Sequence, residues 1–179
     1  MHFLIGLLAG AHTSSWGMYK DAPHEGFTVP KYLRSIIVAG LLGVLLKYLL
    51  DYPLDTWAHA AVFFGIVYAA ERLTLELWKS FIREEDQSKY FIPMQFGVLG
   101  KPIKSRAVRW SILAAVIVIL VVAIWFVIWL QRTRPDLPPW LVILTIGSLG
   151  GWFSAFGGAW KDAPVEGFET FKFFRSPGI

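Results

Sequence analysis

Two short stretches of the chain gather carboxylates and basic side chains at the same spacing. At matching positions each stretch holds two acids and three bases. They are Lys20, Asp21, Glu25, Lys31 and Arg34 in the first stretch and Lys161, Asp162, Glu166, Lys172 and Arg175 in the second. Ammonium and guanidinium groups gathered in this way can bind an anion, a lipid headgroup or an acidic partner through charge-assisted hydrogen bonds. Four carboxylates brought together could instead hold a divalent cation, but the six neighbouring bases disfavour a metal.

A structural role accounts for the same residues without any ligand. Charged groups at the edge of a membrane are costly unless they are paired, so the acids could pair with the bases and cap helix ends. The sequence Lys-Asp-Ala-Pro predicts a helix end followed by a turn, with Asp21 and Asp162 as caps. Gly26 and Gly167 then break the chain a second time. We therefore expect each stretch to form a charged hairpin.

The two stretches belong to an internal duplication. Residues 17–35 and 158–176 are identical at 11 of 19 positions without a gap. The same offset aligns Gly6 with Gly147 and Gly10 with Gly151, so each copy includes the apolar segment before its hairpin. We assign the repeat copies to residues 3–35 and 144–176.

Other catalytic chemistry has little support in the sequence. The chain has no cysteine, which excludes disulfides, thiolate-bound clusters and cysteine nucleophiles. The four histidines show no metal-ligand spacing, and they are His2, His12, His24 and His59. Phosphate-binding, zinc-hydrolase and serine-hydrolase motifs are also missing from the sequence. The sequence therefore implies no catalytic residue, metal or cofactor, and it favours a protein that is not an enzyme.

The composition indicates a membrane protein. The chain is 55% hydrophobic and 17% charged, with a mean hydropathy of +0.52, which lies outside the range of a soluble domain of this size. The formal net charge is +4. Because the basic residues lie beside apolar segments, we expect them to face anionic lipid rather than nucleic acid.

Five apolar segments are long enough, or nearly long enough, to cross a bilayer as helices. They are residues 3–19, 35–50, 56–78, 107–130 and 140–160. We therefore predict an all-α, polytopic helix bundle with about five transmembrane helices, which forms a single membrane domain over residues 1–179. The first segment carries Thr13, Ser14 and Ser15 and should face other protein, whereas the fourth should face lipid.

The topology follows from the number of crossings between the two hairpins. Four spans separate them, so both hairpins lie on one side and the repeat is parallel. Most basic residues lie on that side, and the other side holds Lys47, Arg132 and Arg134. We therefore expect a protein of the cell membrane, with both hairpins and the C-terminus on its cytoplasmic side. The third segment is the weak point because its uninterrupted apolar stretch runs only from residue 58 to residue 70, before Glu71, Arg72 and Glu76, so it could be a buried or interfacial helix. We expect the charges of Glu71 and Arg72 to snorkel to the interface. If this segment does not span, the repeat becomes inverted.

The connection at residues 81–106 is long, apolar and interrupted by proline and glycine. It is expected to lie on the cytoplasmic membrane surface, where Lys101, Lys104 and Arg106 would meet anionic headgroups. A plain cytoplasmic loop is the alternative.

These features favour a non-catalytic subunit or assembly component of a larger membrane complex, with other membrane subunits or a second copy of the chain as partners. A small channel or transporter for an ion or anionic solute is the first alternative, and an enzyme that acts on lipid headgroups is the second. The first copy runs on into a membrane helix, whereas the second stops at Ile179. A sixth helix is therefore expected to be absent or to come from a partner.

Overall fold

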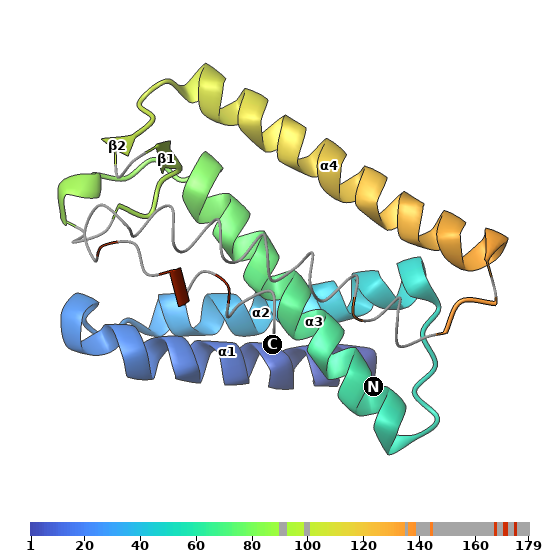
Figure 1. Cartoon of the computed structure of the whole chain (residues 1–179). Helices are drawn as coiled ribbons and strands as arrows, with labels where there is room; N and C mark the ends of the chain where they lie inside the picture. The colour runs from blue at the N-terminus through green and yellow to red at the C-terminus, as the bar shows by residue number, and fades with distance from the viewer. Residues whose placement is uncertain are drawn as a thin grey trace. The chain divides into compact units, whose positions relative to one another are not determined.

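The computed structural model describes residues 1–89, 93–98, 101–134, 136–138, 144, 167, 170–171 and 174, without the side chains of residues 20–25, 89, 127–128 and 131. The chain divides into two compact units, Met1–Leu77 and Trp78–Ile179. The described residues are mostly helical, as the sequence predicted (Figure 1).

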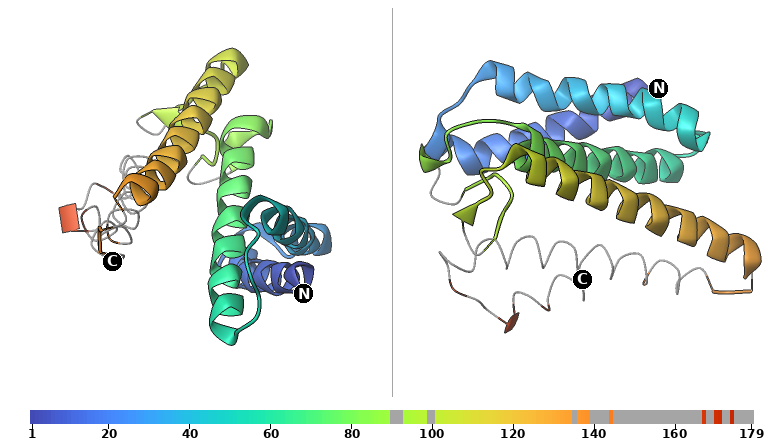
Figure 2. Two further views of the ribbon diagram at one scale, coloured as in Figure 1. Left: turned by 90° about the vertical axis from the view of Figure 1, so that its right-hand side faces the viewer. Right: turned by 90° about the horizontal axis from the view of Figure 1, so that it is seen from above.

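Three long helices form the first unit: α1 (His2–Glu25), α2 (Val29–Leu50) and α3 (Trp57–Leu77). Thr28 precedes α2 and has an extended backbone. A proline lies in the first turn of α2, where the missing N–H costs no helical hydrogen bond. Helix α2 ends at Asp51, which adopts the left-handed conformation and donates its N–H to Lys47 O. Helices α1 and α2 run side by side in opposite directions (Figure 2).

Small residues bring α1 and α2 into backbone contact. A Cβ atom at Gly10 would lie 2.6 Å from Ser35 O, and one at Gly43 would lie 2.6 Å from His2 O. A Cβ atom at Gly6 would lie closer still to the carbonyl oxygen of Ala39. The small residues recur every four positions on both helices, which is the spacing that lets membrane helices approach closely.

Helix α3 contributes one buried stripe to the first unit. Its buried residues are Phe63, Val67, Glu71 and Leu75, which lie one turn apart along a single face. Phe63 and Val67 join Ile5, Ala9 and Ala39 in the hydrophobic core. The first unit is thus a three-helix core with a carboxyl group on its buried face.

The second unit begins with η1, a π-helical segment at Trp78–Ile82, followed by the 3₁₀ segment η2 (Gln87–Lys89). Strands β1 (Gly97–Val98) and β2 (Lys101–Pro102) form an antiparallel hairpin, and α4 (Arg106–Thr133) follows. Phe96 joins the hairpin to η1, because its N–H donates to Ser80 O and its ring stacks on Phe81. The predicted loop of residues 81–106 therefore contains a short folded hairpin.

Within the described part of the chain, two helices are long and apolar enough to cross a membrane, Val29–Leu50 and Arg106–Phe126. Their length and composition agree with a membrane protein. Helices α1, α2, α3 and α4 correspond to the first four predicted segments. Most of the fifth segment, residues 140–160, lies outside the described residues, so the prediction of about five spans remains a prediction.

Candidate functional site

The first charged hairpin is formed by the end of α1, a three-residue connection and the start of α2. Gly26 ends α1 with a φ of +74°, a left-handed conformation that glycine adopts without steric cost. Lys31 and Arg34 lie one turn apart on α2. Lys31 is exposed and Arg34 is partly buried, so the hairpin places two cations at this end of the helix pair.

The prediction that α1 ends at Lys-Asp-Ala-Pro is wrong. Helix α1 continues through Pro23 to Glu25, so Asp21 is a helical residue and not a cap between two helices. A proline in the last turn removes only one backbone hydrogen bond near the end of the helix. The stop is set instead by Gly26, which the sequence also indicated.

Most of the predicted binding residues cannot be placed. The side chains of Lys20, Asp21 and Glu25 and all of Lys161, Asp162, Glu166, Lys172 and Arg175 lie outside the described residues. The anion site and the four-carboxylate metal site therefore remain predictions.

The described residues of the second copy match the first copy locally. Gly167 has a φ of +79°, close to the +74° of its counterpart Gly26. Residues 170, 171 and 174 are helical, as are their counterparts at 29, 30 and 33 in α2. The two equivalent glycines thus share a left-handed backbone, while the repeat of the whole hairpin stays a prediction because most of the second copy lies outside the described residues.

Polar side chains hold α1 against the first turn of α2. Ser14 Oγ donates to the carbonyl oxygen of Tyr32 at 2.7 Å, and Ser15 Oγ lies 3.1 Å from Tyr32 Oη. Thr13 Oγ1 donates to Ala9 O in the preceding turn of α1 at 3.0 Å. Thr13 and Ser14 are both buried, whereas Ser15 is exposed, so the prediction that this run faces other protein holds for its first two residues only. The contacts of Ser14 and Ser15 with Tyr32 hold the helix turn that carries Lys31 and Arg34.

Glu71 is the second notable group in the first unit. The residue is 0% exposed, and both of its carboxylate oxygens are buried. The expectation that Glu71 snorkels to a membrane surface is therefore wrong. Its burial follows from its position on the buried stripe of α3, which a count of charges near a helix end does not reveal.

The second unit contains a buried guanidinium that the sequence analysis missed. The side chain of Arg109 is 4% exposed. Its Nη1 atom donates to Ile103 O at 2.9 Å and Lys104 O at 3.1 Å, its Nε atom donates to Phe81 O at 3.4 Å, and its Nη2 atom donates to Glu84 Oε1 at 3.2 Å. This cluster, which we call the Arg109 clasp, ties η1 and the loop before α4 to the first turn of α4.

Comparisons of the chain with protein-family models, with curated proteins and with solved structures gave no match. The function must therefore be argued from the chain itself. Two sets of described residues offer chemistry: Arg34 and the buried Glu71 in the first unit, and the Arg109 clasp with the basic segment around it.

Proposed function

We propose that the chain is a non-catalytic integral membrane protein that serves as a subunit or assembly component of a larger membrane complex. One observation carries this proposal. The facing sides of α1 and α2 pack through Gly6, Gly10 and Ala39, while the opposite sides of both helices are apolar and exposed. The exposed apolar side chains on these two helices include Leu4, Leu8, Ile37, Leu41 and Leu45.

Small-residue packing with apolar outer faces is suited to a helix pair that lies in lipid or against other membrane helices. In water, an apolar surface of this extent would drive aggregation. Helix α4 supports the same view, because its middle is apolar on all sides and largely exposed, as at Val118, Val121 and Ile124. We infer five spans with a parallel repeat and with both hairpins on the cytoplasmic side, where most basic residues would then lie.

The two charged hairpins are the proposed contact regions for lipid or partner subunits. In the first hairpin, Lys31 and Arg34 occupy a helix turn that Ser14 fixes through Tyr32. A backbone turn that is already ordered lowers the entropy lost when its cations bind an acidic group. The second hairpin would repeat this arrangement with Lys172 and Arg175.

The proposal is tested by affinity purification of the tagged full chain in mild detergent, followed by native mass spectrometry. A subunit should elute with defined partner chains at fixed stoichiometry. The double variant Asp21→Asn with Asp162→Asn should lose those partners, whereas the matched variant Asp55→Asn with Asp136→Asn should keep them. A chain that elutes alone, or only as a copy of itself, would contradict the proposal.

A small channel or transporter is the second candidate, and the buried Glu71 is the observation that favours it. Ionisable groups inside a helix bundle often belong to ion or proton pathways, and the buried hydroxyl groups of Thr13 and Ser14 lie in the same unit. Proteoliposomes that contain the chain should then carry cation or proton flux that Glu71→Gln abolishes. The exposed Glu76→Gln is the matched control and should leave the flux intact.

A further inference from the structure

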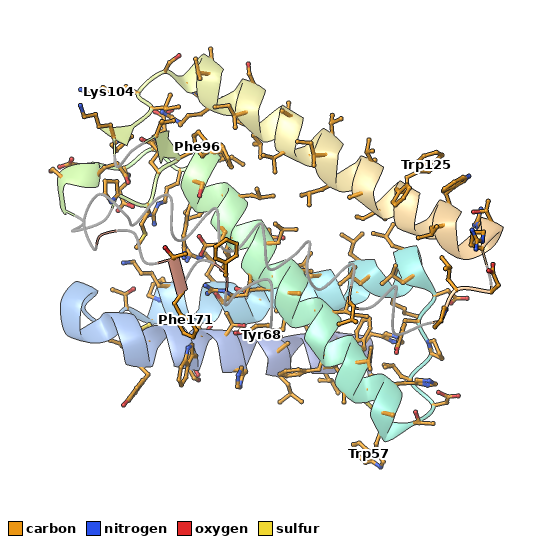
Figure 3. All side chains as sticks on the ribbon, in the orientation of Figure 1. Trp57, Tyr68, Phe96, Lys104, Trp125 and Phe171 are labelled. Carbon is orange, nitrogen blue, oxygen red and sulfur yellow. The ribbon has the colours of Figure 1, made fainter. Side chains whose placement is uncertain are left out.

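The segment that leads into α4 carries three exposed basic side chains. They are Lys101 on β2, Lys104 in the turn and Arg106 at the start of α4, and the side chain of Arg106 is 71% exposed. Lys104 points outward from the turn before α4 (Figure 3). Within the described part of the chain, neither Lys101 nor Lys104 forms an ion pair. Two of the three cations are therefore available to an outside anion.

Apolar side chains accompany these cations. Val98 is paired with Lys101 across the hairpin, and both residues are exposed. Residues directly opposite each other on antiparallel strands share a face. On α4, Trp110 lies one turn after Arg106 and is 43% exposed. Both the hairpin and the helix thus present a cation next to an apolar group, which is the combination that suits a membrane interface.

The Arg109 clasp holds this basic segment in place. Arg109 Nη1 binds the carbonyl oxygens of Ile103 and Lys104, and the N–H of Ile103 donates to Phe96 O at 3.0 Å. The backbone that carries Lys104 is therefore fixed at two consecutive residues. Such preorganisation lowers the entropy lost when a ligand binds.

Nearby carboxylates do not neutralise the segment. Glu84 Oε1 lies 3.6 Å from Arg106 Nε and 3.2 Å from Arg109 Nη2, so one carboxylate serves two arginines. Glu85 forms an ion pair with Arg83 at 3.0 Å. Positive charge remains on Lys101 and Lys104, so the surface attracts anions.

The length of α4 sets the depth of these groups in a bilayer. The apolar stretch from Trp110 to Leu130 rises about 30 Å at about 1.5 Å per residue, which matches the hydrocarbon core of a bilayer. Trp110 then lies at the interface, and Arg106 lies about 6 Å further out, at the level of the lipid phosphates.

We propose that Lys101, Lys104 and Arg106 bind the phosphate groups of anionic lipids at the point where α4 enters the membrane, with Trp110 packed beside the glycerol region. The inference rests on the proposed membrane location of α4. It goes beyond the proposed function because it assigns lipid binding to a surface outside both repeat copies.

Quenching of tryptophan fluorescence by brominated lipid tests the proposal. The full chain is reconstituted into lipid nanodiscs that contain a minor fraction of either brominated phosphatidylglycerol or brominated phosphatidylcholine. The quenching at Trp110 is the difference between the quenching of the parent and that of Trp110→Phe. Each basic residue near an anionic leaflet contributes about a fivefold preference. The triple variant K101Q/K104Q/R106Q should therefore lower the preference of Trp110 for phosphatidylglycerol by about tenfold or more, and added salt should lower the preference of the parent.

The matched control is K47Q/R132Q/R134Q, which removes the same charge at positions outside the basic segment. This control should keep the lipid preference at Trp110. Equal quenching by both brominated lipids in the parent, or an equal loss of preference in the control, would overturn the lipid site and leave the membrane location intact. If neither lipid quenches Trp110, α4 lies outside the bilayer and the proposed function also fails.

Discussion

At the scale of single residues, close contact between α1 and α2 depends on glycines, which have no side chain to separate the two backbones. A methyl group at Gly10 would collide with backbone atoms of α2, which cannot rotate away as a long side chain can. A methyl group at Gly17, on the same helix, would have no neighbouring atom within 4 Å. The two glycines therefore allow a direct comparison within one helix.

We expect Gly10→Ala to destabilise the first unit by about 1–3 kcal/mol, because the backbones must separate or the helix must shift. Gly17→Ala should be neutral or stabilise by up to about 1 kcal/mol through helix propensity. Thermal unfolding in detergent, followed by circular dichroism, measures both. Equal effects of the two substitutions would contradict close packing at Gly10.

Asp55 gives a prediction about pH. The side-chain hydrogen bond from His59 lowers the pKa of Asp55 below its ordinary value of 3.8. A carboxyl group with a lowered folded-state pKa stabilises the fold above its unfolded-state pKa and loses that contribution as the pH falls through the folded-state value.

The effect of Asp55 should therefore be present at neutral pH and disappear below about pH 4. We expect Asp55→Asn to lower the melting temperature slightly at pH 7 and to match the parent near pH 3. The carboxyl group is exposed, so the difference should be small. A difference that grows as the pH falls would contradict this role.

At the scale of elements, the Arg109 clasp joins η1, the hairpin segment and α4. Removing the guanidinium leaves the carbonyl groups of Phe81, Ile103 and Lys104 without this donor, and the bond to Phe81 is buried. A buried polar group left without a hydrogen-bond partner costs about 1–3 kcal/mol. The clasp is therefore expected to control the order of the whole segment before α4.

We expect Arg109→Met to increase hydrogen exchange and proteolysis across residues 83–105, with Arg109→Lys intermediate because lysine lacks the planar fork of donors. Arg106→Met is the matched control, since Arg106 is exposed and its ion pair with Glu84 is long. An exposed pair of this kind contributes at most about 1 kcal/mol. Equal exchange in both methionine variants would show that the clasp does not order the segment.

The sequence predicted the helices better than their ends and contacts. Long apolar runs identified α2 and α4, because a helix that faces lipid needs such a run. The end of α1 was misplaced because Pro23 was read as a stop, whereas the left-handed Gly26 ends the helix. Arg109 was overlooked because most of its partners are backbone carbonyls, which leave no pattern of side-chain types. Glu71 is buried because it lies on the same face of α3 as Phe63 and Val67, and the sequence does not show which face of a helix is covered.

At the scale of the whole molecule, the proposed topology predicts which loops share a side of the membrane. The sequence contains no cysteine, so a single introduced cysteine reports its own side. In the five-span arrangement, Ser88→Cys should react only from the cytoplasm, whereas Thr56→Cys and Asp136→Cys should react with an impermeant maleimide added outside the cell.

If α3 does not span, Ser88→Cys and Thr56→Cys should be labelled from the same side. That result would show that the repeat is inverted and not parallel. The control is each cysteine variant in permeabilised cells, where all three positions should react. The measurement thus decides the topology at its weakest segment.

The short connection between α1 and α2 also bears on how the protein is made. Only residues 26–28 separate the two helices, and the first unit ends at Leu77. Contacts between neighbours in sequence form rapidly, and N-terminal units can fold during synthesis. The α1–α2 pair can therefore form as one helical hairpin while α4 is still being translated, and in the proposed location it would enter the membrane in that form. A ribosome stalled after the first unit has emerged should already carry a protease-resistant α1–α2 pair.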